Sequence, residues 1–237
     1  MAEQDPRFTY AVNNTQVVRP PRQMLATFGT TVIRYYLVTE PVYLDLDVAR
    51  EVKESVVREG TVSAEKPRVV TPYYLSRLEG FGDNARNYLG ELVQEHGPNA
   101  PGLLYAYKNE AMETSFVSGE AWEVAAKIGQ RLDNENKRLA AVILGVDELW
   151  DVSLLKFIYD MTRSSVEVNA AELYASGLLE TEGGVPREAR QRIQLLLEEA
   201  RRGNMDPSAV KRELERWDLF DEYQDQFFSL FRRRKYP

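Results

Sequence analysis

Residues 114–134, TSFVSGEAWEVAAKIGQRLDN, contain the change of pattern that decides the fold. Up to Ser118, short runs of β-branched and aromatic residues alternate with proline and glycine, which is typical of strands and turns. Beyond Ser118, glycine and proline become rare and apolar residues recur at helical spacing. Strands followed by helices indicate an α+β protein rather than alternating βαβ units.

This change divides the chain into parts. We expect an N-terminal arm over residues 1–26, a small mixed α/β-sheet part over 27–118, and an all-helical part over 119–237. The last two are either separate domains or one continuous domain. In the all-helical part the spacing predicts helices at 119–134, 137–145, 148–163, 168–177, 187–202, 207–217 and 219–233.

Upstream of Ser118 the predicted elements are shorter. The clearest is a strand at residues 30–38, TTVIRYYLV. A helix at 45–58 follows, because Leu44, Val48, Val52 and Val56 recur every four residues. We also expect a short strand at 8–12 in the arm, strands within 61–71, helices at 72–78 and 84–94, and a hairpin formed by 103–107 with 114–117.

Composition removes many classes of enzyme. The 237 residues include 30 basic and 37 acidic side chains, giving a net charge of −7, with one histidine and no cysteine. Thiol nucleophiles, thiolate metal sites and multi-histidine metal sites are therefore excluded. We expect no catalytic residue, no metal site and no cofactor. The N-terminus shows no apolar leader and no run is long enough to span a bilayer, so we expect a cytoplasmic protein.

Carboxylates and His96 are the remaining groups with acid–base chemistry. His96 precedes Gly97-Pro98, where an imidazole suits the end of a helix. Asp47, Glu51 and Glu54 would share one face of the predicted 45–58 helix. Oxygen ligands of this kind can hold a divalent cation, so a carboxylate-based, metal-dependent hydrolase is one alternative function.

A nucleic-acid-binding regulator is the other alternative. Residues 152–179 have the rhythm of a helix–turn–helix segment, with Ser164-Ser165 at the turn. Asn169 is the only base-reading side chain in its second helix, and no wing strands are predicted after it. Binding through this module would depend on Arg187, Arg190 or the basic C-terminus. Nucleic acid is therefore the less favoured partner.

Aromatic residues supply two candidate interaction surfaces. Tyr105 and Tyr107 share one face of a predicted strand, where they form either a binding surface or the rim of the core. The C-terminal helix is the stronger candidate, because its apolar arc is wider than one domain needs. A basic run follows it at once, which could also touch phosphate or an anionic membrane. The candidate residues there are Phe220, Tyr223, Phe227, Phe231, Arg232, Arg233, Arg234 and Lys235.

Together these patterns favour a non-catalytic interaction, regulatory or structural protein. Its predicted partner is a second copy of the chain, in a homo-oligomer, or another protein. We expect the C-terminal helix to dock on its own domain or on a partner.

Overall fold

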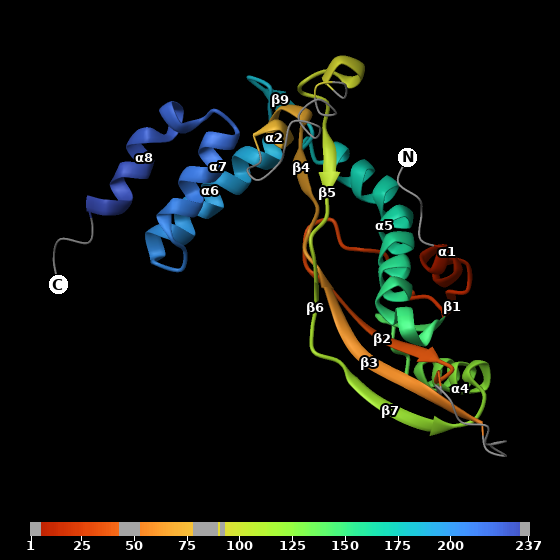
Figure 1. Ribbon diagram of the computed structural model, residues 1–237. Coiled ribbons are helices and arrows are strands. Elements are labelled where there is room, and N and C mark those ends of the chain that lie inside the picture. The colour runs from red at the N-terminus through yellow and green to blue at the C-terminus, as the bar shows by residue number, and fades with distance from the viewer. Residues whose placement is uncertain (1–5, 43–52, 78–89, 91–92, 233–237) are drawn as a thin grey trace. The chain divides into compact units, whose positions relative to one another are not determined.

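The computed structural model describes residues 6–42, 53–77, 90 and 93–232, with Arg232 described by its backbone alone (Figure 1). The chain divides into two compact units. The first, here the sheet unit, comprises residues 1–66 and 105–169, and the second, the helical unit, comprises residues 67–104 and 170–237. Each unit is thus built from two stretches of chain, rather than from the residues on either side of Ser118.

The sheet unit contains one mixed sheet. Its strands run in the order β1, β8, β2, β3, and both β6 and β7 pair with β3. β8 is parallel to β2, and the other pairs are antiparallel. The elements are α1 (Pro6–Asn13), β1 (Gln16–Arg19), β2 (Thr31–Thr39), β3 (Glu54–Ala64), β6 (Tyr107–Asn109), β7 (Glu113–Ser118), α4 (Ala121–Asn134), β8 (Ala140–Gly145), the short η1 (Asp147–Leu149) and α5 (Trp150–Ala175), which continues into the helical unit.

Helices cover both faces of this sheet. Tyr35 and Ile143 point to the face on which Phe157 of α5 packs. Tyr36 and Val142 point to the opposite face, where α4 packs. Because successive side chains of a strand alternate between faces, both sets of β2 and β8 residues become buried. The two cores therefore lie on either side of the sheet.

In the helical unit, the described helices pack around an apolar core. Its elements are β4 (Arg68–Val70), α2 (Pro72–Ser76), β5 (Gly102–Leu104), β9 (Thr181–Glu182), β10 (Val185–Pro186), α6 (Arg187–Arg202), α7 (Pro207–Arg216) and α8 (Phe220–Arg232). β4 pairs with β5, and β9 with β10. Ile193, Leu214 and Trp217 are fully buried at the centre of the core.

Local signals set the bounds of these helices. α6 ends at Gly203, which adopts a left-handed conformation with φ of 86°. The carboxylate of Asp206 accepts a hydrogen bond from the Ser208 N–H, and Pro207 occupies the first turn of α7. The turn between α6 and α7 is therefore fixed by its sequence.

The α+β class is confirmed, with strands concentrated before residue 119 and helices after it. Several predicted elements are wrong. The arm forms helix α1 rather than a strand, and 137–145 contains strand β8 rather than a helix. Glu54 to Arg58 belong to strand β3, and the rest of the predicted 45–58 helix lies outside the described residues, apart from Lys53. The segments 103–107 and 114–117 do not pair with each other, because β5 pairs with β4 and β7 with β3.

The other predicted elements agree more closely. β2, α2, α4, α6, α7 and α8 lie within two residues of the predicted bounds. Most of the predicted 84–94 helix lies outside the described residues, which continue as helix at 93–96. Of the described helices, none has both the length and the apolar composition needed to cross a membrane.

Candidate functional site

α8 has two apolar stripes with different surroundings. Tyr223, Phe227 and Leu230 are 6%, 6% and 8% exposed and belong to the core of the helical unit. Phe228 and Phe231 are 46% and 49% exposed. Residues three or four apart lie on the same side of a helix, so the first set forms one buried stripe. The second set forms a stripe beside it that its own unit leaves half open.

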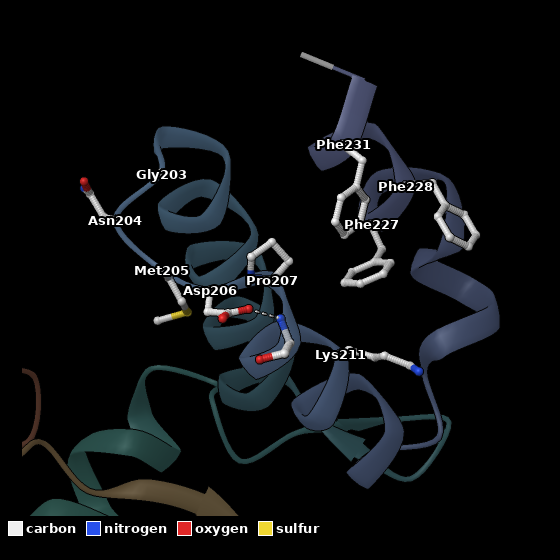
Figure 2. Close-up of a pocket in the computed structure, with 10 residues that line it drawn as sticks. Gly203, Asn204, Met205, Asp206, Pro207, Lys211, Phe227, Phe228 and Phe231 are labelled. Carbon is white, nitrogen blue, oxygen red and sulfur yellow. Dashed lines mark hydrogen bonds between the residues drawn. The ribbon is translucent and has the colours of Figure 1, made fainter. Parts of the chain in front are cut away.

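A groove lies between this second stripe and the turn that joins α6 to α7. Its volume is about 740 Å³. Figure 2 shows Phe227 and Phe231 pointing from α8 toward this turn, with Lys211 extending from α7 below them. We call it the α8 groove, and its lining residues are Gly203, Asn204, Met205, Asp206, Pro207, Ser208, Lys211, Phe227, Phe228 and Phe231.

The groove has apolar walls and a few polar groups. Phe227 contacts the rings of Phe228 and Phe231 edge to face, at centroid distances of 5.8 and 5.5 Å. The carboxylate of Asp206 holds the Ser208 N–H at 2.8 Å, and the Lys211 ammonium lies 3.5 Å from Glu215. A lining of this kind suits apolar side chains of a partner, with the polar groups setting orientation.

The structure places the predicted site residues of α8 in three environments. Phe220 is partly buried and packs against Phe227 at 5.5 Å, and Tyr223 and Phe227 are core residues. Phe231 lines the groove. The backbone of Arg232 ends α8, whereas Arg233, Arg234 and Lys235 lie outside the described residues. The helix thus docks within its own unit through one stripe only.

Tyr105 and Tyr107 are half-buried against α5. The Tyr105 hydroxyl donates to Asn169 at 2.7 Å, and the Tyr107 hydroxyl is hydrogen-bonded to Thr162. Burial raises the pKa of the Tyr105 phenol to about 12. Both hydroxyls are therefore committed to α5, and this arrangement supports the rim-of-core alternative for the pair.

The predicted helix–turn–helix is wrong. α5 runs without a break from Trp150 to Ala175, because the Ser165 hydroxyl bonds back to the Met161 carbonyl and does not interrupt the helix. A β9–β10 hairpin follows, although strands were not predicted there. Its turn residues Gly183 and Gly184 both have positive φ.

The cations proposed for nucleic-acid binding in this region have acidic partners. Arg187 pairs with Glu180 at 2.6 Å and Arg190 with Glu222 at 2.5 Å. The hydrogen bond to Glu222 raises the pKa of the Arg190 guanidinium. Paired cations of this kind contribute less to phosphate binding than free ones.

The carboxylates proposed for a hydrolase are not brought together in the described part of the chain. Glu54 lies in strand β3, and Asp47 and Glu51 fall outside the described residues. Among the described residues no group of three acidic, histidine or cysteine side chains could hold a metal ion. His96 is exposed at a helix end, 3.7 Å from Glu95.

One further carboxylate, that of Asp147, has a defined role in the sheet unit. The Asp147 carboxylate accepts hydrogen bonds from the Thr39 hydroxyl at 2.6 Å and the Arg58 guanidinium at 2.7 Å. Burial raises the pKa of this carboxyl, but these two hydrogen bonds, the positive charge of Arg58 and a hydrogen bond from the Val42 backbone together outweigh burial and hold the pKa below its ordinary value. Thr39 ends β2 and Asp147 follows β8, so the cluster ties together the ends of two parallel strands.

A second charged cluster is buried in the helical unit. The Arg192 guanidinium donates to Glu188 at 2.8 Å and to Glu213 at 2.9 Å. Glu213 also accepts from the Tyr74 hydroxyl and from the Trp217 indole N–H. All three charged side chains are under 10% exposed, so this cluster joins α6 to α7 inside the core rather than facing a ligand.

Sequence reasoning missed part of the α8 groove. Phe228 was visible in the sequence as a member of the aromatic helix. Nothing in the sequence indicated that Met205, Pro207 and Lys211 line a groove, because their place beside α8 results from tertiary packing. No protein family, curated protein or solved structure matches this chain.

Proposed function

We propose that this protein is a non-catalytic interaction protein that works as an oligomer of its own chain, and that its copies meet at the α8 groove. The observation that carries the proposal is the second stripe of α8. Phe228 and Phe231 stay about half exposed on a helix whose neighbouring stripe is fully used by its own core. Clustered apolar surface of this kind marks interaction sites.

A second copy fits this surface better than an unrelated occupant. In Figure 2 the Phe228 ring points away from the turn between α6 and α7, whereas Phe227 and Phe231 point toward it, so one helix presents both a protruding ring and a groove that could receive such a ring. In a two-fold dimer each copy presents the same patch, so a self-complementary patch fills both grooves at once. This supports a second copy as the partner.

The expected affinity is modest. A phenylalanine buries about 150–250 Å², so covering the exposed halves of Phe228 and Phe231 removes roughly 200 Å² of apolar surface per copy. At about 25 cal/mol per Å² this contributes about 5 kcal/mol per copy. The two copies together gain about 10 kcal/mol. Association itself costs about 4–15 kcal/mol, which leaves at most about 6 kcal/mol, so we expect a weak dimer with a dissociation constant of about tens of micromolar or more.

Sedimentation equilibrium of the full chain tests this proposal. The wild type should shift from monomer to dimer as its concentration rises through about tens to hundreds of micromolar. The double variant Phe228→Gln, Phe231→Gln should remain monomeric. Leu195→Gln is the matched control, because Leu195 is 53% exposed on α6 but does not line the groove.

Three outcomes of this experiment bear on whether the copies meet at the α8 groove. A dimer that persists in the Leu195→Gln control but is lost in the phenylalanine variant supports the proposal. A wild type that stays monomeric throughout the concentration range overturns it. A dimer that the phenylalanine variant retains in full also overturns it, because the copies then meet elsewhere.

A further inference from the structure

The sheet unit contains a pocket at the end of the sheet face that α4 covers. Tyr36 and Val32 of β2 lie on that face, but Tyr36 is 5% exposed beneath α4 and Val32 is 50% exposed. The pocket includes this uncovered part, and the segment 135–139, which joins α4 to β8, also lines it. Its volume of about 610 Å³ is within the range of small-molecule sites, about 300–1,000 Å³. We call it the β2 pocket, and its charged and apolar lining includes Val32, Arg34, Glu135, Lys137, Arg138 and Leu139.

The charged lining of the β2 pocket is mainly basic, although the chain as a whole has a net charge of −7. Arg34, Lys137 and Arg138 supply the cations, and Glu135 supplies the one carboxylate. Arg34 lies 3.5 Å from Glu59. Lys137 and Arg138 have no ion-pair partner among the described residues. Two exposed cations are therefore available to bind an anion in the pocket.

The carboxylate of Asp133, two residues before Glu135, is already used by other cations. It accepts hydrogen bonds from the guanidinium groups of Arg19 and Arg22, each at 2.8 Å. The hydrogen bond from Arg19 is the main cause that holds the pKa of this carboxyl below its ordinary value. Asp133 does not line the pocket. It therefore does not neutralise the two available cations.

The backbone that carries these two cations is held in place by hydrogen bonds. The Lys137 carbonyl accepts from the Arg19 guanidinium at 2.8 Å. The Arg138 carbonyl accepts from the Arg22 N–H at 2.8 Å, and the next carbonyl accepts from the Arg34 N–H at 3.0 Å. Because these bonds use the backbone of the segment, they persist when its side chains are replaced. A segment that is ordered before binding lowers the entropic cost of binding a ligand.

We propose that the β2 pocket binds a phosphorylated small molecule of about the size of a nucleotide. A phosphate monoester carries a charge of about −2 near neutral pH, so it neutralises Lys137 and Arg138 together, whereas a carboxylate carries a single charge. Arg34 adds a guanidinium, whose planar shape suits phosphate oxygens. Val32 and Leu139 supply apolar surface for the uncharged part of the ligand. This site belongs to the sheet unit and does not depend on dimerisation through the α8 groove.

Isothermal titration calorimetry of the full chain with ATP, without magnesium, tests the class of ligand. ATP combines phosphate groups with a largely apolar base. Adenosine lacks the phosphates and tripolyphosphate lacks the nucleoside, so each should bind at least about fivefold more weakly than ATP. Because the attraction is between charges at an exposed site, ATP should bind more weakly as the salt concentration rises.

Variants of the lining test the location of the site. Lys137→Gln with Arg138→Gln should weaken ATP binding at least about tenfold. The matched control is Lys127→Gln with Arg163→Gln, which also removes one lysine and one arginine, at exposed positions of the sheet unit outside the pocket. Glu135→Gln removes the carboxylate of the pocket and should strengthen binding about twofold or more. Circular dichroism and thermal melting show that each variant is folded before it is compared.

The outcomes support or overturn this inference independently of dimerisation. Tighter binding of ATP than of both its fragments, with a loss in the Lys137 and Arg138 variant alone and a gain in Glu135→Gln, supports the proposal. An equal loss in the control variant overturns it, because binding then follows net charge. Tripolyphosphate that binds as tightly as ATP overturns the assigned class of ligand. Absence of ATP binding at low salt also overturns the proposal.

Discussion

The two units use their apolar surfaces differently. In the sheet unit, α4 and α5 cover opposite faces of the sheet, and the central strands β2 and β8 are buried from both sides. In the helical unit, α8 buries Tyr223 and Phe227 but leaves Phe228 and Phe231 over a groove. The sheet unit also exposes large apolar side chains, among them Phe8 and Tyr10 on α1, Leu155 and Tyr159 on α5, and Phe116 on β7. The difference is that the exposed rings of α8 line a groove of their own unit.

The units also differ in how deeply their charged clusters are buried. Arg192 and its two glutamates are at most 8% exposed inside the helical core. Asp147, in the sheet unit, is 18% exposed at the ends of two strands. Because the cost of an unpaired charge rises with burial, equivalent substitutions should differ in effect between the two clusters.

The largest expected effect is on the Arg192 cluster. Arg192→Met removes the buried cation that Glu188 and Glu213 share, and should lower the free energy of unfolding by about 3–5 kcal/mol. Arg201→Met, at an exposed position of the same helix, is the control and should change stability little. Urea denaturation measures both variants. Equal losses of stability in Arg192→Met and Arg201→Met would show that burial does not determine how much this cluster contributes to stability.

The next effect compares two neighbouring rings of α8. Phe227→Ala opens a cavity in the helical core and should cost about 3–4 kcal/mol. Phe228→Ala, at the exposed stripe, should change the stability of the monomer by less than about 0.5 kcal/mol. Thermal melting at dilute concentration, where the chain is monomeric, measures this contrast. Similar losses for both variants would mean that the second stripe also belongs to the core.

A smaller effect is expected at the edge of the sheet unit. Asp147→Asn removes the anion that Arg58 and Thr39 bind, and should cost about 1–3 kcal/mol. The exposed Asp151→Asn serves as the control on the neighbouring turn. If urea denaturation shows that Asp147→Asn lowers the free energy of unfolding no more than Asp151→Asn does, the cluster does not stabilise the strand ends.

The smallest predicted effect is the pH dependence of the stability lost in Asp147→Asn. Folding lowers the pKa of the Asp147 carboxyl. Its contribution to the free energy of unfolding is therefore complete at pH values above its pKa in the unfolded chain, which is about 4. This stabilisation is lost as the pH falls through the lower pKa that the carboxyl has in the folded protein. The gap in unfolding free energy between wild type and Asp147→Asn should therefore be constant near neutrality and narrow below about pH 4. A gap that widens on acidification would contradict the assignment.

Much of the helical unit was predictable from sequence because its signals are local. α6 and α8 have apolar residues at helical spacing, and Asp206-Pro207 marks the start of α7. The sheet unit depends on pairing between distant residues, which local patterns do not record. Residues 140–145 were predicted as helix because a strand buried on both faces shows a continuous apolar run without alternation.

The candidate site was predictable in part for the same reason. The aromatic sequence of α8 indicated a docking helix, and Tyr223 and Phe227 do dock. Which rings face the core and which face the groove depends on how α8 lies against α6 and α7, and that arrangement leaves no local pattern. Pro207 marks the start of α7, but no local pattern in the sequence places it or Met205 beside α8.

Light scattering of two single variants tests the central claim most directly, because it compares the two units. Phe228→Gln removes an exposed ring from the α8 groove, and Phe116→Gln removes a more exposed ring, at 67%, from the sheet unit. If copies meet at the groove, the wild type and Phe116→Gln should dimerise alike, and Phe228→Gln should need about tenfold more protein to reach the same mass. Dimerisation that Phe116→Gln abolishes and Phe228→Gln preserves would contradict the account.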